Sequence, residues 1–133
     1  MNMKKNRTKT NSAKYVDGFV LVVPKKKVAA YRKMAQEGSR IWKKYGALEY
    51  KECVGDDLSP NMGGMPALTF PKMIKLKKGE TVWFSFVTYK SRAHRDQVNK
   101  KVMAEMDKKY KDAPPMPFDM KRMAYGGFKV IVD

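Results

Sequence analysis

The sequence predicts an α+β domain, a four-stranded antiparallel sheet in the ferredoxin-like order β-α-β-β-α-β with both helices on one face. Two segments place apolar residues at helical spacing, and four others are rich in aromatic and β-branched residues, with turn residues between them. A length of 133 residues fits one domain. We expect residues 1–13 to form a disordered basic arm and residues 14–133 to form the single domain.

The first half of the domain is predicted to contain a strand, a helix and a second strand. Residues 15–23 are aromatic and β-branched and stop at Pro24, which is typical of a strand. Residues 25–45 have helical period, and Gly46 stands where a C-terminal cap belongs. Residues 47–54 predict the next strand. The apolar stripe of the helix consists of Val28, Tyr31, Ala35, Gly38, Trp42 and Tyr45.

The second half begins with a long loop. Residues 55–71 hold three prolines and two adjacent glycines, and a loop of this length is either functional or hides an element. We predict that residues 73–76 and 81–89 form a hairpin around the turn at 77–80.

A helix and a last strand complete the predicted domain. Ser91 is a good N-cap for a helix that ends near Lys109 and turns Val98 and Val102 inward. Residues 122–132 predict the last strand. Gly126 and Gly127 interrupt it, which indicates a bulge or a close approach of the backbone, either at a dimer seam or to a ligand.

The strands are apolar on both faces, which bears on assembly. Along residues 81–89, Phe84 and Phe86 point one way, while Trp83, Val87 and Tyr89 point the other. Two helices cover only one face of a sheet, so we expect a second copy of the chain to cover the other. The alternative is that the long loop and the termini fold over that face.

The charge of the chain bears on its partners. It carries 29 Lys and Arg against 13 Asp and Glu, a net charge of +16, and the excess extends beyond the basic arm. Weak, salt-sensitive binding to nucleic acid is therefore expected. Exposed aromatic residues interleaved with Lys and Arg, which would build a stacking platform for nucleic acid, are not evident.

The composition also bears on location. Cys53 has no second cysteine to pair with, which favours a reducing, cytoplasmic compartment. No apolar run approaches the roughly 18 residues of a membrane helix. The basic start followed by residues 19–23 imitates a signal peptide, but Asp17 interrupts the apolar stretch and no small-residue cleavage site follows, so we expect no export.

The stretch Ser91-Arg-Ala-His-Arg-Asp96 is rich in chemically active side chains. Its Ser, His and Asp do not make a triad, because His94 and Asp96 point to different sides of a helix. Its His-Arg-Asp also fails as a kinase loop, since Lys101 stands where the required Asn belongs. His94 alone remains a candidate for proton transfer, and the alternative is a histidine hydrogen-bonded at the edge of the core.

The other candidate residues are expected to bind a ligand. Arg95 and Arg122 would hold an anionic group, and Asp119 would contact a polar ligand or pair with a nearby base to fix its loop. Tyr125 would present its hydroxyl to the interior of a barrel formed by the sheets of two copies. Asp17 either faces the ligand or pairs with Arg122 across strands, and we favour the pair. One His and one Cys make no recognisable metal-ligand set, and no cofactor is predicted.

Several segments resemble the YbaA-like family of small bacterial proteins, a family of unknown function within the dimeric α/β-barrel superfamily. The matching segments are YVDGFVLVVP at 15–24, FPKMIKLKKGETVWFSF at 70–86, YKSRAHRDQVNKKVM at 89–103 and MPFDMKRMAYGGFKVIV at 116–132. The resemblance implies a homodimer whose two sheets face each other as a barrel. It implies no reaction, and other superfamily members are cofactor-free monooxygenases, isomerases and haem-binding or haem-degrading proteins.

Together these observations predict a small cytoplasmic homodimer that binds a small organic ligand in an apolar cavity. One alternative is a cofactor-free enzyme of the monooxygenase or isomerase type. Another is a weak, non-specific nucleic-acid-binding protein. Whether the chain is an enzyme is left open by the sequence.

Overall fold

The computed structural model describes residues 12–133, so nearly all of the predicted basic arm at 1–13 lies outside the described residues. The α+β class is confirmed. The elements are β1 (Tyr15–Pro24), the 3₁₀ turn η1 (Lys25–Lys27), α2 (Val28–Lys44), β2 (Glu49–Val54), α3 (Phe70–Met73), β3 (Glu80–Tyr89), α4 (Arg92–Lys109), the 3₁₀ turn η2 (Met120–Arg122) and β4 (Ala124–Lys129).

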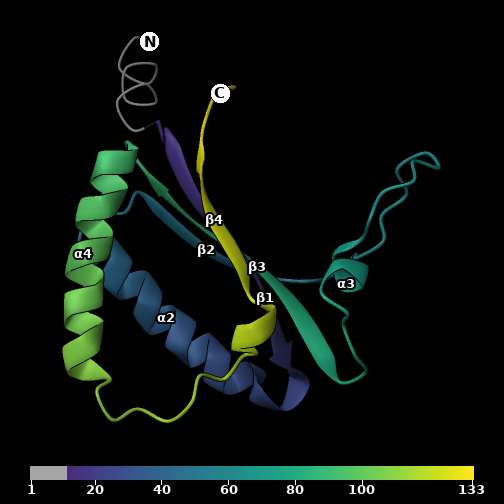
Figure 1. Cartoon of the computed structure of the whole chain (residues 1–133), viewed down its shortest axis with the longest axis horizontal. Coiled ribbons are helices and arrows are strands. Elements are labelled where there is room, and N and C mark those ends of the chain that lie inside the picture. Colours follow the sequence, from purple (N-terminus) through teal and green to yellow (C-terminus); the bar gives the residue numbers. More distant parts are fainter. Residues whose placement is uncertain (1–11) are drawn as a thin grey trace, which may run out of the picture.

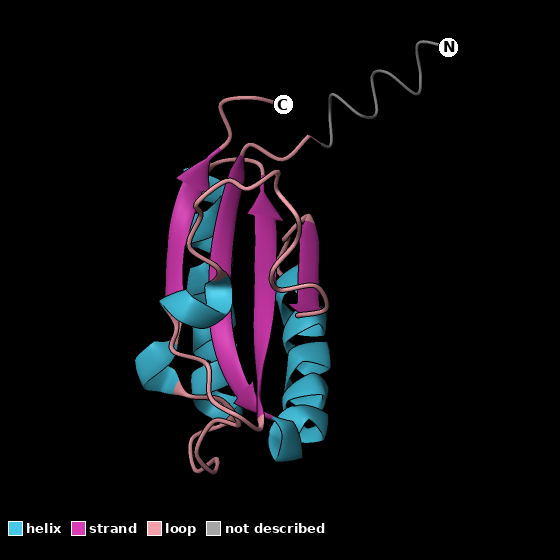
Figure 2. Ribbon diagram, turned by 90° about the vertical axis from the view of Figure 1, so that its right-hand side faces the viewer, coloured by secondary structure: helices cyan, strands magenta, loops and turns pink. Residues whose placement is uncertain are grey.

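The four strands form one antiparallel sheet in the order β2-β3-β1-β4. The two central strands pair along ten residues, from Tyr15 opposite Tyr89 to Pro24 opposite Glu80. The edge strands β2 and β4 are shorter, at six residues each. Helices α2 and α4 cover one face of the sheet, and α3 with the loop before it lies on the other side (Figures 1 and 2).

The main core lies between the sheet and the two long helices. Alternate residues of the strands point toward the helices, as the period of two requires. Ile41 of α2 and Val98 of α4 are fully buried against Tyr89 at one end of this layer. At the other end, Tyr31 of α2 packs against Trp83 with ring centroids 4.9 Å apart.

The predicted hairpin is wrong, because residues 73–76 form no strand. The side chain of Thr69 accepts a hydrogen bond from the backbone N–H of Lys72 and caps α3, and proline in the first turn favours this start. Lys75 then turns the chain with a φ of 54°. Ile74 is buried by this turn against Val22 and Val82, on the face opposite the long helices.

The last strand is shorter and more regular than predicted. Residues 120–122 form η2, and β4 pairs with β1 only from Ala124 to Lys129. The predicted bulge is absent, since Gly126 and Gly127 keep the register opposite Gly18 and Asp17. The close approach that the structure shows is to β1 of the same chain, because a Cβ on Gly127 would lie 3.0 Å from a carboxylate oxygen of Asp17 and closer still to Tyr15.

Candidate functional site

The face of the sheet that α2 and α4 leave uncovered, here called the open face, is apolar. Its residues alternate along the strands with those of the helix side. Phe84 and Phe128 remain 44% and 63% exposed on it. The side chains and glycines of the open face on the two central strands and on β4 are Val16, Gly18, Val20, Val22, Val82, Phe84, Phe86, Thr88, Ala124, Gly126 and Phe128.

Within the described residues, only one end of the open face is covered by the chain itself. Val22 and Val82 are buried there under Ile74, with Leu58 and Leu76 packed beside them. The predicted alternative, a loop folded over this face, therefore holds for that end alone.

The exposed part of the open face is a groove of about 650 Å³. Val16, Val20 and the rings of Phe84, Phe86 and Phe128 line it. No charged side chain is among its lining residues. Such a surface is suited to apolar atoms, which gain free energy by leaving water, and offers nothing to a bare anion.

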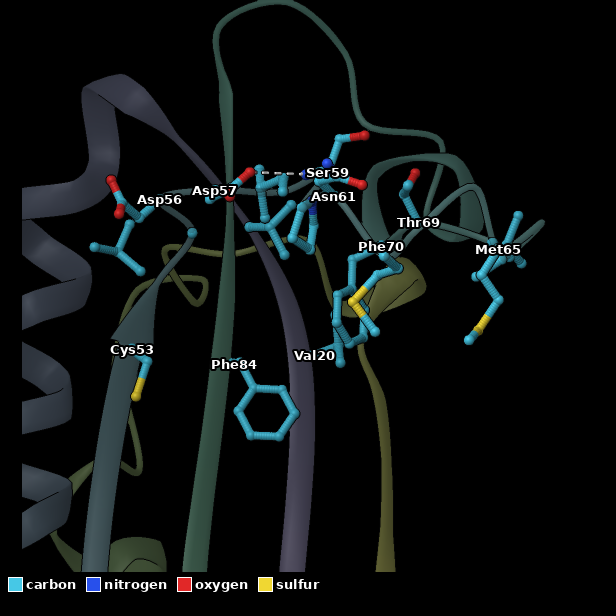
Figure 3. A pocket seen from close by; sticks show the side chains of 18 of the residues that line it. Val20, Cys53, Asp56, Asp57, Ser59, Asn61, Met65, Thr69, Phe70 and Phe84 are labelled. Carbon is cyan, nitrogen blue, oxygen red and sulfur yellow. Dashed lines mark hydrogen bonds between the residues drawn. The ribbon is translucent and has the colours of Figure 1, made fainter.

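A second hollow, of about 670 Å³, lies between the open face and the loop of residues 55–69, here called the loop arm. Phe84 of the sheet and Phe70 at the base of the arm approach edge to face, with centroids 6.3 Å apart. Figure 3 shows Cys53, Val20 and Phe84 on the strand side of this hollow, and Met65 on a part of the loop well apart from Phe84.

The candidate residues Asp17 and Arg95 meet on the helix side of the sheet. Arg95 donates to a carboxylate oxygen of Asp17 at 2.8 Å and to the hydroxyl of Tyr15 at 3.3 Å. Its guanidinium also lies over the Tyr15 ring, 5.0 Å from the centroid. The predicted pair of Asp17 with Arg122 is wrong, because α4 brings Arg95 to the buried carboxylate instead.

Burial raises the pKa of Asp17, and the charge of Arg95 opposes that rise. Next to this pair, Asn99 of α4 accepts hydrogen bonds from the hydroxyl of Tyr89 and the indole N–H of Trp42, each at 3.2 Å. Among the described residues no buried side-chain polar atom lacks a hydrogen-bond partner. A network with every group satisfied anchors α4 to the sheet and keeps little capacity for a ligand.

A second polar group beneath the sheet surrounds Glu52, which the sequence analysis did not select. Its two carboxylate oxygens accept from Tyr31 at 2.7 Å and Tyr50 at 2.8 Å. Burial raises the pKa of Glu52. Gly38 makes room for this arrangement, since a Cβ there would come within 2.8 Å of the Tyr50 hydroxyl.

Arg122 and Asp119 bind each other and hold the chain together at the far end of β1. Arg122 contacts Asp119 at 2.7 Å, both carboxylate oxygens of Glu80, and the carbonyl of Lys75 at 3.0 Å. These hydrogen bonds lower the pKa of Glu80 and that of Asp119. The pairing of Asp119 with a nearby base is therefore confirmed as the arrangement of this loop.

The two arginines are too far apart to hold one anion. The partner of Arg122 is Glu80, which pairs with Pro24 at one end of β1, whereas the partner of Arg95 is Asp17, near the other end. Pro24 lies seven positions after Asp17, roughly 23 Å along the strand.

His94 lies at the start of α4, at the edge of the core. Its Nδ1 accepts a hydrogen bond from the backbone N–H of Lys90 at 3.0 Å, and its own backbone N–H donates to Ser91 Oγ. Its ring meets Tyr89 edge-on. Partial burial and the charge of Lys90 lower the pKa of His94. This is the alternative stated for His94 above, and the residue does not line either hollow of the open face.

Tyr125 is the one candidate that borders the groove of the open face. It stacks on Phe19, with ring centroids 6.0 Å apart, and is largely exposed at the edge of β4. No group of three or more His, Cys, Asp or Glu side chains within residues 12–133 is placed to hold a metal ion.

The loop at 55–71 was predicted to be functional or to hide an element, but its place beside the open face was not predicted. One signal was available: residues 52–71 form the longest stretch without Lys or Arg, in a chain with 29 basic residues.

None of the helices described by the structure is long and apolar enough to cross a membrane.

The fold and the site define a small α+β protein with an antiparallel sheet and one uncovered apolar face. A family model described as "Protein of unknown function (DUF1428)" matches residues 14–120, and the chain belongs to this family. It is 41% identical over 121 residues to the uncharacterized protein YbaA of Escherichia coli K12, covering 90% of this chain and 98% of that protein. The same values hold for YbaA of Shigella flexneri.

Among solved structures, the de novo designed protein Foldit4 aligns with 88% of this chain and 98% of its own, at 11% identity and a TM-score of 0.46. A likeness of this degree carries no argument about function. The resemblance predicted from the sequence segments is confirmed by the family match and the YbaA relatives.

Proposed function

We propose that the chain is a ferredoxin-like protomer of a homodimeric α/β barrel, in which two open faces pack together and enclose an apolar cavity for a small organic ligand. The observation that carries this proposal is the exposure of Phe84 and Phe128 on a sheet face that the chain covers at one end only. Large exposed apolar patches are typical of interaction sites.

A second copy is the partner that best fits the open face. Two copies related by a two-fold axis bring the same apolar surface together from both sides, which is how most homodimers form. Stacked sheets lie about 10 Å apart, so the aromatic side chains of the two faces line the space between them.

The ligand follows from the lining of the groove. Val16, Phe84, Phe86 and Phe128 offer apolar contacts without charge, which favours an uncharged apolar or aromatic molecule. The hydroxyl of Thr88, on the open face and among the lining residues, is a polar group of the groove that could orient such a molecule.

Sedimentation velocity tests the dimer. We expect the wild-type chain to sediment as a dimer and the variants Phe84→Lys and Phe128→Lys as monomers, because a charge at the seam of two apolar faces would be buried without a partner. Met103→Lys is the matched control, since Met103 is as exposed as Phe84 but lies on α4. A wild-type monomer, or a Phe84→Lys variant that still dimerises like the control, would overturn the proposal.

Titration with the uncharged dye N-phenyl-1-naphthylamine tests the cavity. We expect saturable fluorescence enhancement with the wild-type dimer and a loss of most of it in Val16→Phe, which fills the groove without adding charge. A variant with Met103→Phe should bind the dye as the wild type does. A dimer with no saturable dye binding would contradict the ligand part of the proposal and leave the dimer in place.

A further inference from the structure

The loop arm presents apolar side chains that the rest of residues 12–133 leaves largely exposed. Met62, Met65 and Leu68 are 58%, 64% and 70% exposed. Figure 1 shows the loop extending away from the sheet beyond α3, on the side of the open face. Hydrogen bonds within the arm are local, from Ser59 N–H to Asp57 and from Gly63 N–H to Asn61.

Resting on the proposed homodimer, we propose that each loop arm reaches across the seam and packs Met62, Met65 and Leu68 against the open face of the partner, so that the ligand cavity is complete only in the dimer. The cavity between the two open faces is then lined by both sheets and also by the two loop arms, each of which comes from across the seam.

The area of the sheet supports this arrangement. Two strands of ten residues and two of six offer roughly 500 Å² of flat face. One end of that face is already covered by Ile74. A stable interface of standard size buries about 800 Å² of accessible surface on each partner. The arm adds the exposed side chains of Met62, Met65 and Leu68 to the apolar surface of this side, and flexible methionines fit such a contact well.

The charges on the arm select its occupant. It carries Asp56 and Asp57 and no Lys or Arg, whereas the chain as a whole has a net charge of +16. An acidic apolar arm is attracted to a basic protein such as a second copy of this chain, and it is repelled by nucleic acid or an anionic membrane.

Photocrosslinking in a mixed dimer tests the crossing of the arm. The variant Met65→p-benzoylphenylalanine is produced in an unlabelled (light) and a ¹⁵N-labelled (heavy) form. The two forms are refolded together and irradiated. We expect mixed light–heavy peptides that join residue 65 to β3 or β4. If the wild-type chain is a dimer but every crosslink joins two peptides of the same label, the arm stays on its own chain and this inference fails alone.

The dimer affinity gives a second readout. Replacing Met62, Met65 and Leu68 by Ser is expected to weaken dimerisation by roughly 10- to 100-fold, as truncation of interface anchors does. The matched control replaces Met103 and Met116, which are exposed elsewhere in the chain, by Ser. An unchanged dissociation constant in the arm variant would overturn the arm contact, whereas a wild-type monomer would instead overturn the proposed function.

Discussion

Asp17 and Arg95, 78 residues apart in the sequence, form an ion pair of 2.8 Å that joins the first strand to the last long helix. Asp17 is almost fully buried, and Arg95 keeps a fifth of its side chain exposed. Together with the hydrogen bond from Tyr89 to Asn99, the pair fixes the position of the N-terminal part of α4 on the sheet. The pair is therefore structural in this fold.

Asp17→Asn is expected to lower the free energy of unfolding by roughly 2–4 kcal/mol, because it leaves the partly buried guanidinium without its carboxylate. Urea unfolding measures the change. Asp96→Asn is the control, since Asp96 pairs with the same arginine at 2.9 Å but is 61% exposed, and exposed pairs contribute little. Equal losses in the two variants would show that burial of the pair does not matter.

Gly127→Ala is expected to destabilise the protein by about 1–3 kcal/mol, as overpacking of a filled site does. The new methyl would meet the Tyr15 hydroxyl and the Asp17 carboxylate. Gly126→Ala, one residue away, meets only the Phe128 ring at an ordinary 3.7 Å and should be neutral or slightly stabilising. Thermal unfolding of both variants decides, and a tolerated Gly127→Ala would contradict the close approach.

Arg122→Ala is expected to lower the melting temperature by roughly 5 °C or more, the shift that ~1–2 kcal/mol produces in a small domain. The change removes the bonds to Glu80 and Asp119 and releases the Lys75 carbonyl. Circular dichroism melts measure it. Arg40→Ala removes an exposed pair with Glu37 and should leave the melting temperature nearly unchanged. An equally small change in melting temperature for Arg122→Ala would show that its contacts with Glu80, Asp119 and Lys75 do not stabilise the fold.

His94 is expected to make the fold less stable as the pH falls below about 6.5. Burial and Lys90 lower its pKa in the folded state, so the unfolded chain takes up the proton first. The contribution of neutral His94 to the free energy of unfolding is fully present above the ordinary pKa of 6.5, and it is lost as the pH falls toward the lower pKa of the folded state. Protonation of Nδ1 also removes the acceptor of the Lys90 N–H.

His94→Asn tests this dependence, because Asn Oδ1 can accept the same hydrogen bond and does not titrate. Melting temperatures are compared between pH 7.5 and 5.5. The wild type should lose more than the variant across this interval. Parallel curves would show that His94 does not contribute to the pH dependence.

The parts of the fold that depend on local pattern could be predicted from the sequence. The first strand was predicted at 15–23 and runs to Pro24, and the helix after Ser91 has the predicted cap, with Ser91 Oγ accepting from His94 N–H. The short helix α3 was missed, because the cap at Thr69 precedes only one turn and no apolar period can show in four residues. Ile41 lay outside the predicted stripe and is fully buried.

The candidate site depended on contacts that the pattern does not contain. The two apolar faces of the strands were visible in the sequence, and the exposure of Phe84 agrees with them. The partner of Asp17 was not visible, because it depends on where α4 crosses the sheet. The assembly inferred from the two faces stays a prediction.

Gly127, opposite Asp17, also restricts the register in which the edge strand β4 can pair with β1. A shift of two residues keeps the faces of a strand but would bring Tyr125 or Lys129 opposite Asp17, where no Cβ fits. A shift of one residue would turn Phe128 toward the helix side and Tyr125 toward the open face. The missing side chain of Gly127 thus protects the edge strand β4 against misaligned pairing.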